Sequence, residues 1–178
     1  MVDSDCHLDF PDYAGDEEGG VMRAGAAGVG TCLSIGTELA RFTGVRAVAE
    51  KFPDVWCTVG VHPHEAEKEL LIDAAPLLAE TGHPKVVGIG ETGLDYFRER
   101  ASKQDQLRAF IAQLELARET SKPLVIHTRA AAAHTIGTLR DHAAGATLRL
   151  HSLPIPRRVA RRIAARWGSA SAGAPASP

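Results

Sequence analysis

The sequence predicts an α/β protein built as a (β/α) TIM-type barrel with about six βα units. Short β-type runs alternate with helical stretches, and most of the runs end on a histidine or a carboxylate. Because the carboxyl ends of barrel strands converge on one open face, these side chains should form one polar cluster. An open doubly wound sheet is the alternative, and the many polar strand ends favour the barrel. The β-type runs are Met1–Val2, Gly30–Ile35, Val55–Val61, Lys85–Ile89, Pro123–Ile126 and Ala146–Leu150.

The segment Ser102–Thr120 carries the clearest helix signals. Ser102 with Asp105 three residues later is a variant of the capping box, and apolar residues recur along the segment at spacings of three and four. One β-type run starts at Lys85 before this helix and another starts at Pro123 after it, as in a parallel βαβ unit. Comparable helices are expected over Glu38–Lys51, Glu65–Thr81 and Ala132–Ala144.

Length and composition limit the architecture. The chain has 178 residues, 44% of them hydrophobic, enough for one sizeable core and too few for two ordinary domains. A closed eight-stranded barrel takes at least about 200 residues, so we expect an incomplete barrel over residues 1–152. The cysteines show no Cys-x-x-Cys spacing, and the N-terminus lacks the features of a signal peptide. We therefore expect a cytoplasmic protein with no membrane partner and no implied protein partner.

The composition changes sharply after residue 152. All 22 acidic residues lie at or before Asp141, whereas residues 153–178 contain five arginines and end in a Pro/Gly/Ser/Ala-rich run. Such a composition favours a disordered basic tail that is not native to the fold. Nucleic-acid binding by this tail is an alternative, which its single aromatic residue, Trp167, disfavours.

Residue types that bind divalent cations stand at five predicted strand ends. Asp5 and His7 are two residues apart in a strand, so both side chains point to the same face. Glu91 lies in a glycine-rich stretch where backbone and ligand can approach closely, and a carboxylate there suits a bridge between two cations. His127 and His151 follow two later apolar runs.

Three further residues are candidates for substrate binding. His62 and His64 flank Pro63, which restricts His62 to extended backbone and holds the pair in place. Arg129 follows the β-type run at Pro123, and its guanidinium suits a phosphate or a carboxylate. The other histidines are expected to be ordinary surface residues: His83, His134 and His142.

The chain resembles the TatD family of metal-dependent deoxyribonucleases, within the amidohydrolase-like barrels. The matching motifs are Asp-Ser-x-Cys-His-Leu at 3–8, Gly-Val-His-Pro-His at 60–64, Gly-Ile-Gly-Glu-Thr-Gly-Leu-Asp-Tyr at 88–96 and Pro-Leu-Val-Ile-His-Thr-Arg at 123–129. The resemblance implies a TIM-type barrel that holds one or two divalent ions, Mg²⁺, Mn²⁺ or Zn²⁺. It also implies hydrolysis of phosphodiester bonds in DNA with 3′-to-5′ exonuclease activity.

By this resemblance the metal-ligand positions are Asp5, His7, Glu91, His127 and His151, and Glu91 is the catalytic candidate. Asp5 stands where the family has the first histidine of His-x-His, which favours harder cations such as Mg²⁺ or Mn²⁺. The family's late aspartate has no counterpart after Asp141. We therefore expect a truncated or frameshifted product with impaired activity. The alternatives are a non-catalytic barrel fragment and a related metal-dependent C–N or ester hydrolase.

Overall fold

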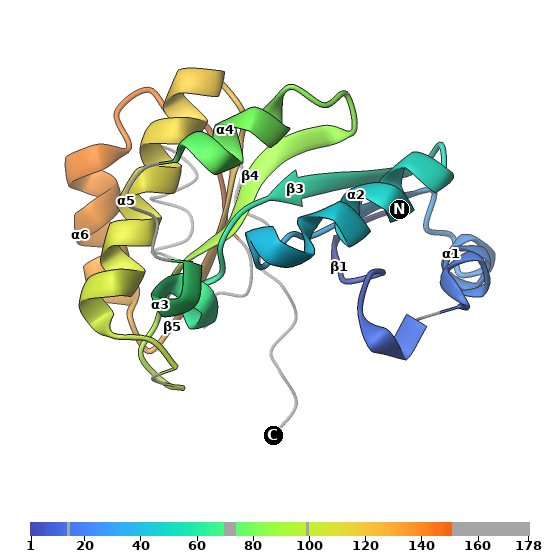
Figure 1. Ribbon diagram of the computed structural model, residues 1–178, viewed down its shortest axis with the longest axis horizontal. Helices are drawn as coiled ribbons and strands as arrows, with labels where there is room; N and C mark the ends of the chain where they lie inside the picture. Colours follow the sequence, from blue (N-terminus) through green and yellow to red (C-terminus); the bar gives the residue numbers. More distant parts are fainter. Residues whose placement is uncertain (14, 70–73, 99, 151–178) are drawn as a thin grey trace.

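The strands form one parallel sheet that follows the order of the sequence. The computed structural model describes residues 1–150 except 14, 70–73 and 99 (Figure 1). Within them six strands lie in the order β1-β2-β3-β4-β5-β6, and a doubly wound sheet would instead reverse at a switch point. The predicted barrel-type winding is therefore confirmed. The strands are β1 (Val2–Cys6), β2 (Thr31–Ser34), β3 (Val55–Val59), β4 (Val86–Asp95), β5 (Leu124–Arg129) and β6 (Leu148–Leu150).

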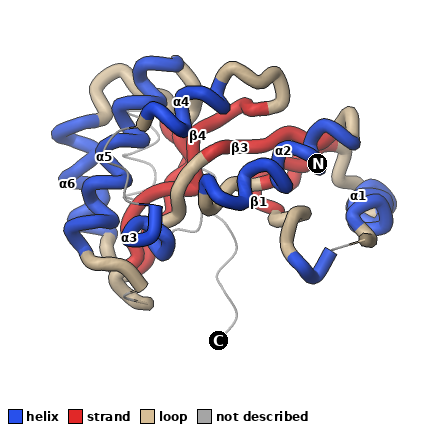
Figure 2. The backbone as a smooth tube through the Cα atoms, in the orientation of Figure 1, coloured by secondary structure: helices blue, strands red, loops and turns tan. Residues whose placement is uncertain are grey.

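Helices connect the strands and lie outside the sheet (Figure 2). The α-helices are α1 (Glu17–Ala26), α2 (Phe42–Lys51), α3 (Ala66–Glu69), α4 (Ala75–Thr81), α5 (Lys103–Thr120) and α6 (Ala132–His142). Short 3-10 helices are η1 (Pro11–Tyr13), η2 (Leu39–Arg41) and η3 (Pro63–Glu65). Helices α5 and α6 pack together on one flank, and α1 lies at the opposite end of the view (Figure 1). Among the described residues no helix has both the length and the apolar composition to cross a membrane.

Helix α5 begins where the capping signal predicts. The Ser102 hydroxyl accepts the backbone N–H of Asp105 at 3.0 Å, which satisfies one of the free donors of the first turn. The helix buries Phe110 and Leu114 against the sheet, but it also buries two glutamines, Gln106 and Gln113. These glutamines position the candidate site, as described below.

The structure differs from the predicted elements in several places, and in the stretch expected as one helix over Glu65–Thr81 it has the separate helices α3 and α4. Strand β4 continues past Ile89 to Asp95, because Gly93 adopts a φ of 135° and a Cβ there would lie 2.0 Å from the carbonyl oxygen of His127. Glycine alone permits this close pairing with β5. The sequence pattern also does not predict α1, because none of its side chains is buried and it therefore lacks an apolar stripe.

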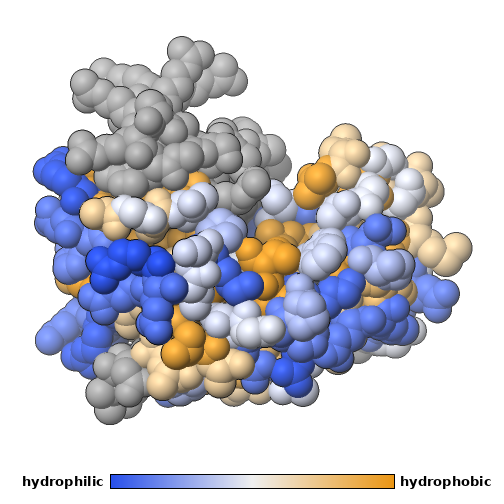
Figure 3. Space-filling model, turned by 90° about the horizontal axis from the view of Figure 1, so that it is seen from above, coloured by the Kyte–Doolittle hydropathy of each residue, from blue (hydrophilic) through white to orange (hydrophobic). Residues whose placement is uncertain are grey.

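Within the described residues the inner face of the sheet is open, as expected for an incomplete barrel. Strands β1 and β6 do not pair with each other in the part of the chain that the structure describes. Side chains of β1 to β5 line a hollow of about 590 Å³, among them Val2, Leu33, Trp56, Val87 and Val125. Seen from above Figure 1, hydrophobic residues reach the surface between hydrophilic regions (Figure 3). The predictions for His151 and for the tail 153–178 lie outside the described residues.

Candidate metal centre

The carboxyl half of the sheet brings the predicted ligands together. Glu91 donates its backbone N–H to the carbonyl oxygen of Gly36 at 2.7 Å, and His62 donates to that of Thr37 at 2.7 Å. The segment that follows β2 thus aligns both residues. At the crossing point a Cβ on Gly60 would lie 2.4 Å from the Cα of Gly90, so glycine is required for β3 and β4 to approach this closely.

Two groups of potential metal ligands share one carboxylate. The inner group is Glu91, His127 and His62, the last of which the sequence predicts for substrate binding, and the outer group is Asp5, His7 and Glu91. In each group the ligand atoms lie within 4.8 Å of one another. Glu91 is buried and belongs to both, which is the arrangement expected of a carboxylate that bridges two cations.

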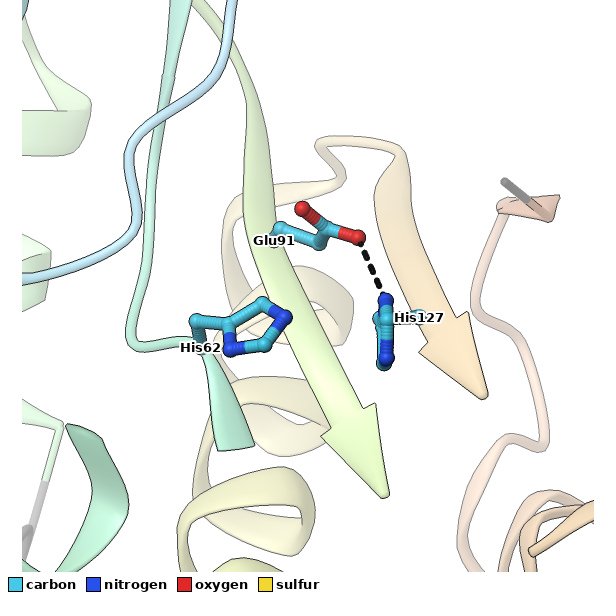
Figure 4. A group of neighbouring side chains, drawn as sticks. All are labelled: His62, Glu91 and His127. Carbon is cyan, nitrogen blue, oxygen red and sulfur yellow. Dashed lines mark hydrogen bonds and ion pairs between the residues drawn. The ribbon is translucent and has the colours of Figure 1, made fainter. Parts of the chain in front are cut away.

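The inner group is held by direct contacts between its members. The Nδ1 of His127 lies 3.0 Å from Oε1 of Glu91 (Figure 4). The His62 ring packs edge-on against the His127 ring at 4.6 Å between centroids. In Figure 4 one ring nitrogen of His62 faces the other two side chains.

Asp95, which the sequence argument does not select, completes this network. The Nε2 atoms of His64 and His127 lie 2.8 and 3.2 Å from Oδ2 of Asp95. The backbone N–H groups of Phe97 and Arg98 donate to its Oδ1. The side chain is 1% exposed. Burial raises the pKa of this carboxyl, but the two N–H groups and two imidazoles outweigh burial and lower the pKa to about 2. The sequence signal for Asp95 is its place in the motif at 88–96, four residues after Glu91.

The two buried glutamines of α5 fix the strand ends beneath this network. Gln106 accepts the backbone N–H of Asp95 at 2.8 Å and donates to its carbonyl oxygen at 3.1 Å. Gln113 makes the same pair of bonds with Val61, at 2.9 and 3.0 Å, and donates to the Thr92 hydroxyl at 2.7 Å. The backbone next to His62 and that of Asp95 are therefore clamped by one helix.

The outer group is more open. Asp5 and His7 have side chains that are 28% and 30% exposed, and His7 Nε2 lies 3.9 Å from Asp5 Oδ1. The His7 ring stacks on Phe10 at 4.6 Å between centroids. Both residues belong to the edge strand β1 and its end, where the register with β2 shifts between Asp3 and Cys6.

The pKa values of the two histidines of the inner group are shifted in opposite directions. Burial lowers the pKa of His62 to about 3, so its ring is neutral at physiological pH. Its Nδ1 accepts the backbone N–H of His64 at 3.1 Å, which leaves the ring hydrogen on Nε2. Burial also lowers the pKa of His127, but the hydrogen bonds and charges of Glu91 and Asp95 outweigh it and raise this pKa.

The donors fit divalent cations. Carboxylate oxygens and imidazole nitrogens are ligand types of Mg²⁺, Mn²⁺ and Zn²⁺. The Nδ1 of His7 is buried and has no hydrogen-bond partner among the described residues, which leaves a nitrogen available for coordination. The proton that His127 shares with Glu91 occupies a position that a cation could take instead.

The remaining predicted residue, Arg129, lies farther along β5. Its guanidinium carbon stands 4.0 Å above the centre of the Phe97 ring. It is two residues beyond His127 in the same strand and therefore faces the same side. The structure thus brings all the predicted site residues within its described range to the carboxyl end of the sheet.

The sequence is similar to those of known metal-dependent hydrolases. The TatD related DNase family matches residues 2–174. The chain is 35% identical over 131 residues to the uncharacterized metal-dependent hydrolase YjjV of Escherichia coli K12, covering 72% of this chain and 51% of that one. It is 37% identical over 129 residues to the 3′-5′ ssDNA/RNA exonuclease TatD of Escherichia fergusonii, covering 72% and 50%.

A solved structure shows the same fold. The crystal structure of the E. coli K12 TatD homolog YjjV superimposes with a TM-score of 0.84 at 30% sequence identity, covering 93% of this chain and 64% of that one. The chain spans about half the length of the curated relatives that it matches. With its consecutive parallel strands, shared carboxylate and ordered motifs, the chain belongs to the TatD related DNase family.

Proposed function

We propose that this chain is a divalent-metal-dependent phosphodiesterase that removes nucleotides from the 3′ end of single-stranded DNA. The observation that carries the proposal is the position of Glu91, whose buried carboxylate belongs to both groups of ligands. The E. fergusonii relative is named a 3′-5′ ssDNA/RNA exonuclease, which supports the class of substrate and the direction of cleavage.

The site residues divide the chemical work between them. Divalent cations bound here would stabilise charge on a phosphate and lower the pKa of a water molecule. Glu91, Asp5, His7 and His127 would hold them, with His151 as a further proposed ligand outside the described residues. Because Asp95 bonds the Nε2 of His127, the ring keeps its Nδ1 directed at Glu91.

The substrate phosphate would meet hydrogen-bond donors on the same face. His62 is neutral with its hydrogen on Nε2, so it can donate to a phosphate oxygen without carrying a charge. Arg129, two residues beyond His127 in β5, supplies a permanent positive charge on the same face of the strand. His64, bonded through Nε2 to Asp95, holds the segment that presents His62.

Two measurements test the proposal. Calorimetric titration should show that Mn²⁺ or Zn²⁺ binds the chain, and a 5′-labelled single-stranded oligonucleotide should shorten from its 3′ end only when metal is present. Activity that survives a chelator would contradict it, and faster cleavage of an amide or carboxylate ester would favour the C–N or ester hydrolase.

A further inference from the structure

Two aromatic residues follow β4 at the rim of the site. Tyr96 and Phe97 come directly after Asp95, the last residue of the strand. Phe97 is 63% exposed, more than any other described Phe, Tyr or Trp. Covering an exposed aromatic side chain of this size with a ligand would remove apolar surface from water and favour binding, although a single exposed apolar residue alone proves no site.

A positively charged side chain lies over the ring of each of these aromatic residues. The Arg129 guanidinium carbon lies 4.0 Å from the centre of the Phe97 ring, and the Lys103 ammonium lies 4.8 Å from that of Tyr96. The Tyr96 hydroxyl also bonds Nδ1 of His134 at 2.5 Å. Because the Arg129 guanidinium covers one face of the Phe97 ring, the solvent-exposed surface of the ring is its other face and its edges.

The Phe97 ring is tied to the catalytic network through its backbone. Its N–H donates to Oδ1 of Asp95 at 2.9 Å, and Oδ2 of the same carboxylate bonds His127 at 3.2 Å. Arg129 is two residues beyond His127 in β5. A ligand that touches Phe97 and Arg129 is therefore next to the proposed cleavage site.

We propose that Phe97, supported by Arg129, is a stacking platform for a base of the single-stranded substrate, which rests on the function proposed above. Every base has a flat π-face, so an aromatic ring binds single strands without reading their sequence. The guanidinium under the ring adds a charge for the neighbouring phosphate. The other exposed large apolar side chains lie on other elements, so the rim fits one flat ligand better than an apolar protein surface.

The test separates the base from the backbone of the strand. The probe is a labelled, phosphorothioate-linked oligothymidylate in Mg²⁺, a hard cation that binds sulfur poorly and therefore supports little hydrolysis of this linkage. Its partner is the same backbone with every base removed. Fluorescence anisotropy should show that Phe97→Ala weakens binding of the oligothymidylate by about 5- to 150-fold, because base stacking contributes about 1–3 kcal/mol. The same variant should change binding of the abasic strand little. Phe97→Tyr should retain the affinity.

Met22→Ala is the matched control, because Met22 is 67% exposed on α1, at the opposite end of Figure 1. Equal weakening of both strands by Phe97→Ala, or no weakening of either, overturns the stacking platform while the wild-type chain still binds and cleaves DNA. A wild-type chain that binds neither strand and cleaves none overturns the proposed function as well.

Discussion

The inner and outer groups of ligands share Glu91 but are built differently. In the inner group His127 is bonded on one side by Glu91 and on the other by Asp95, whose side chain is almost fully buried. In the outer group the side chains of Asp5 and His7 are about 30% exposed. The His7 ring stacks on Phe10, and its Nε2 lies 3.9 Å from Oδ1 of Asp5. The members of the inner group are thus in direct contact with one another, whereas the side chains of Asp5 and His7 are more exposed to solvent.

This difference follows from the sheet. The inner residues stand on β4 and β5 and beside β3, central strands that have partners on both sides. Helix α5 also bonds the backbone of Asp95 at the end of β4 and that of Val61 just after β3. The outer residues stand at β1, which has a single partner, β2, within residues 1–150. Hydrogen bonds from outside the ligand set orient ligands and strengthen metal binding. We therefore expect tighter and more selective metal binding at the inner group.

Removing the shared carboxylate should give the largest effect. Glu91→Ala takes one ligand from each group, so the distinction between them should disappear. Loss of a partner outside the ligand set typically costs about 10- to 100-fold in metal affinity or activity, and loss of a shared ligand should cost more. Calorimetry with Mn²⁺ and the oligonucleotide assay check this. Activity close to that of the parent would remove Glu91 from the metal centre.

Removing the hydrogen bonds of Gln113 should mainly lower the stability of the fold. Gln113→Leu leaves the buried N–H and carbonyl of Val61 and the Thr92 hydroxyl without their glutamine partner. We expect the free energy of unfolding to fall by about 2–4 kcal/mol. Denaturant unfolding measures it, with Gln104→Leu as the control because Gln104 is exposed on the same helix. Equal stability of the two variants would show that the clamp contributes nothing.

Most of the fold, and part of the difference between the inner and outer groups, can be predicted from the sequence. Alternating β-type runs and helices predict the parallel winding, and the strand-end residues predict which side chains meet. The pairing of Glu91 with His127 depends on β4 continuing through Gly90 and Gly93, a backbone path that hydrophobic periodicity does not reveal. Gln106 and Gln113 look like exposed helix residues in sequence, because only the packed structure shows which backbone groups they bond.

Weakening the inner group alone should have a smaller effect. Asp95→Asn keeps the shape but removes the charge that holds His64 and His127, so we expect metal affinity to fall by about 10- to 100-fold. Calorimetry should show this loss at one ion per chain, with the second unaffected. Asp141→Asn on α6 is the control, since Asp141 is exposed. Equal loss at both ions would show that the two groups are not independent.

The smallest effect should come from the outer group, where a substitution changes preference rather than binding as a whole. Asp5→His replaces a hard oxygen ligand by a borderline nitrogen ligand and removes one negative charge from the site. Affinity for Zn²⁺ should therefore rise relative to Mg²⁺. Competition calorimetry measures the ratio, and Asp12→His, at an exposed position on η1, controls for a histidine added elsewhere. Because His127 and Asp95 remain in place, binding at the inner group should stay as in the parent. An unchanged ratio would mean that Asp5 does not touch the cation, and the outer group would then reduce to His7 and Glu91.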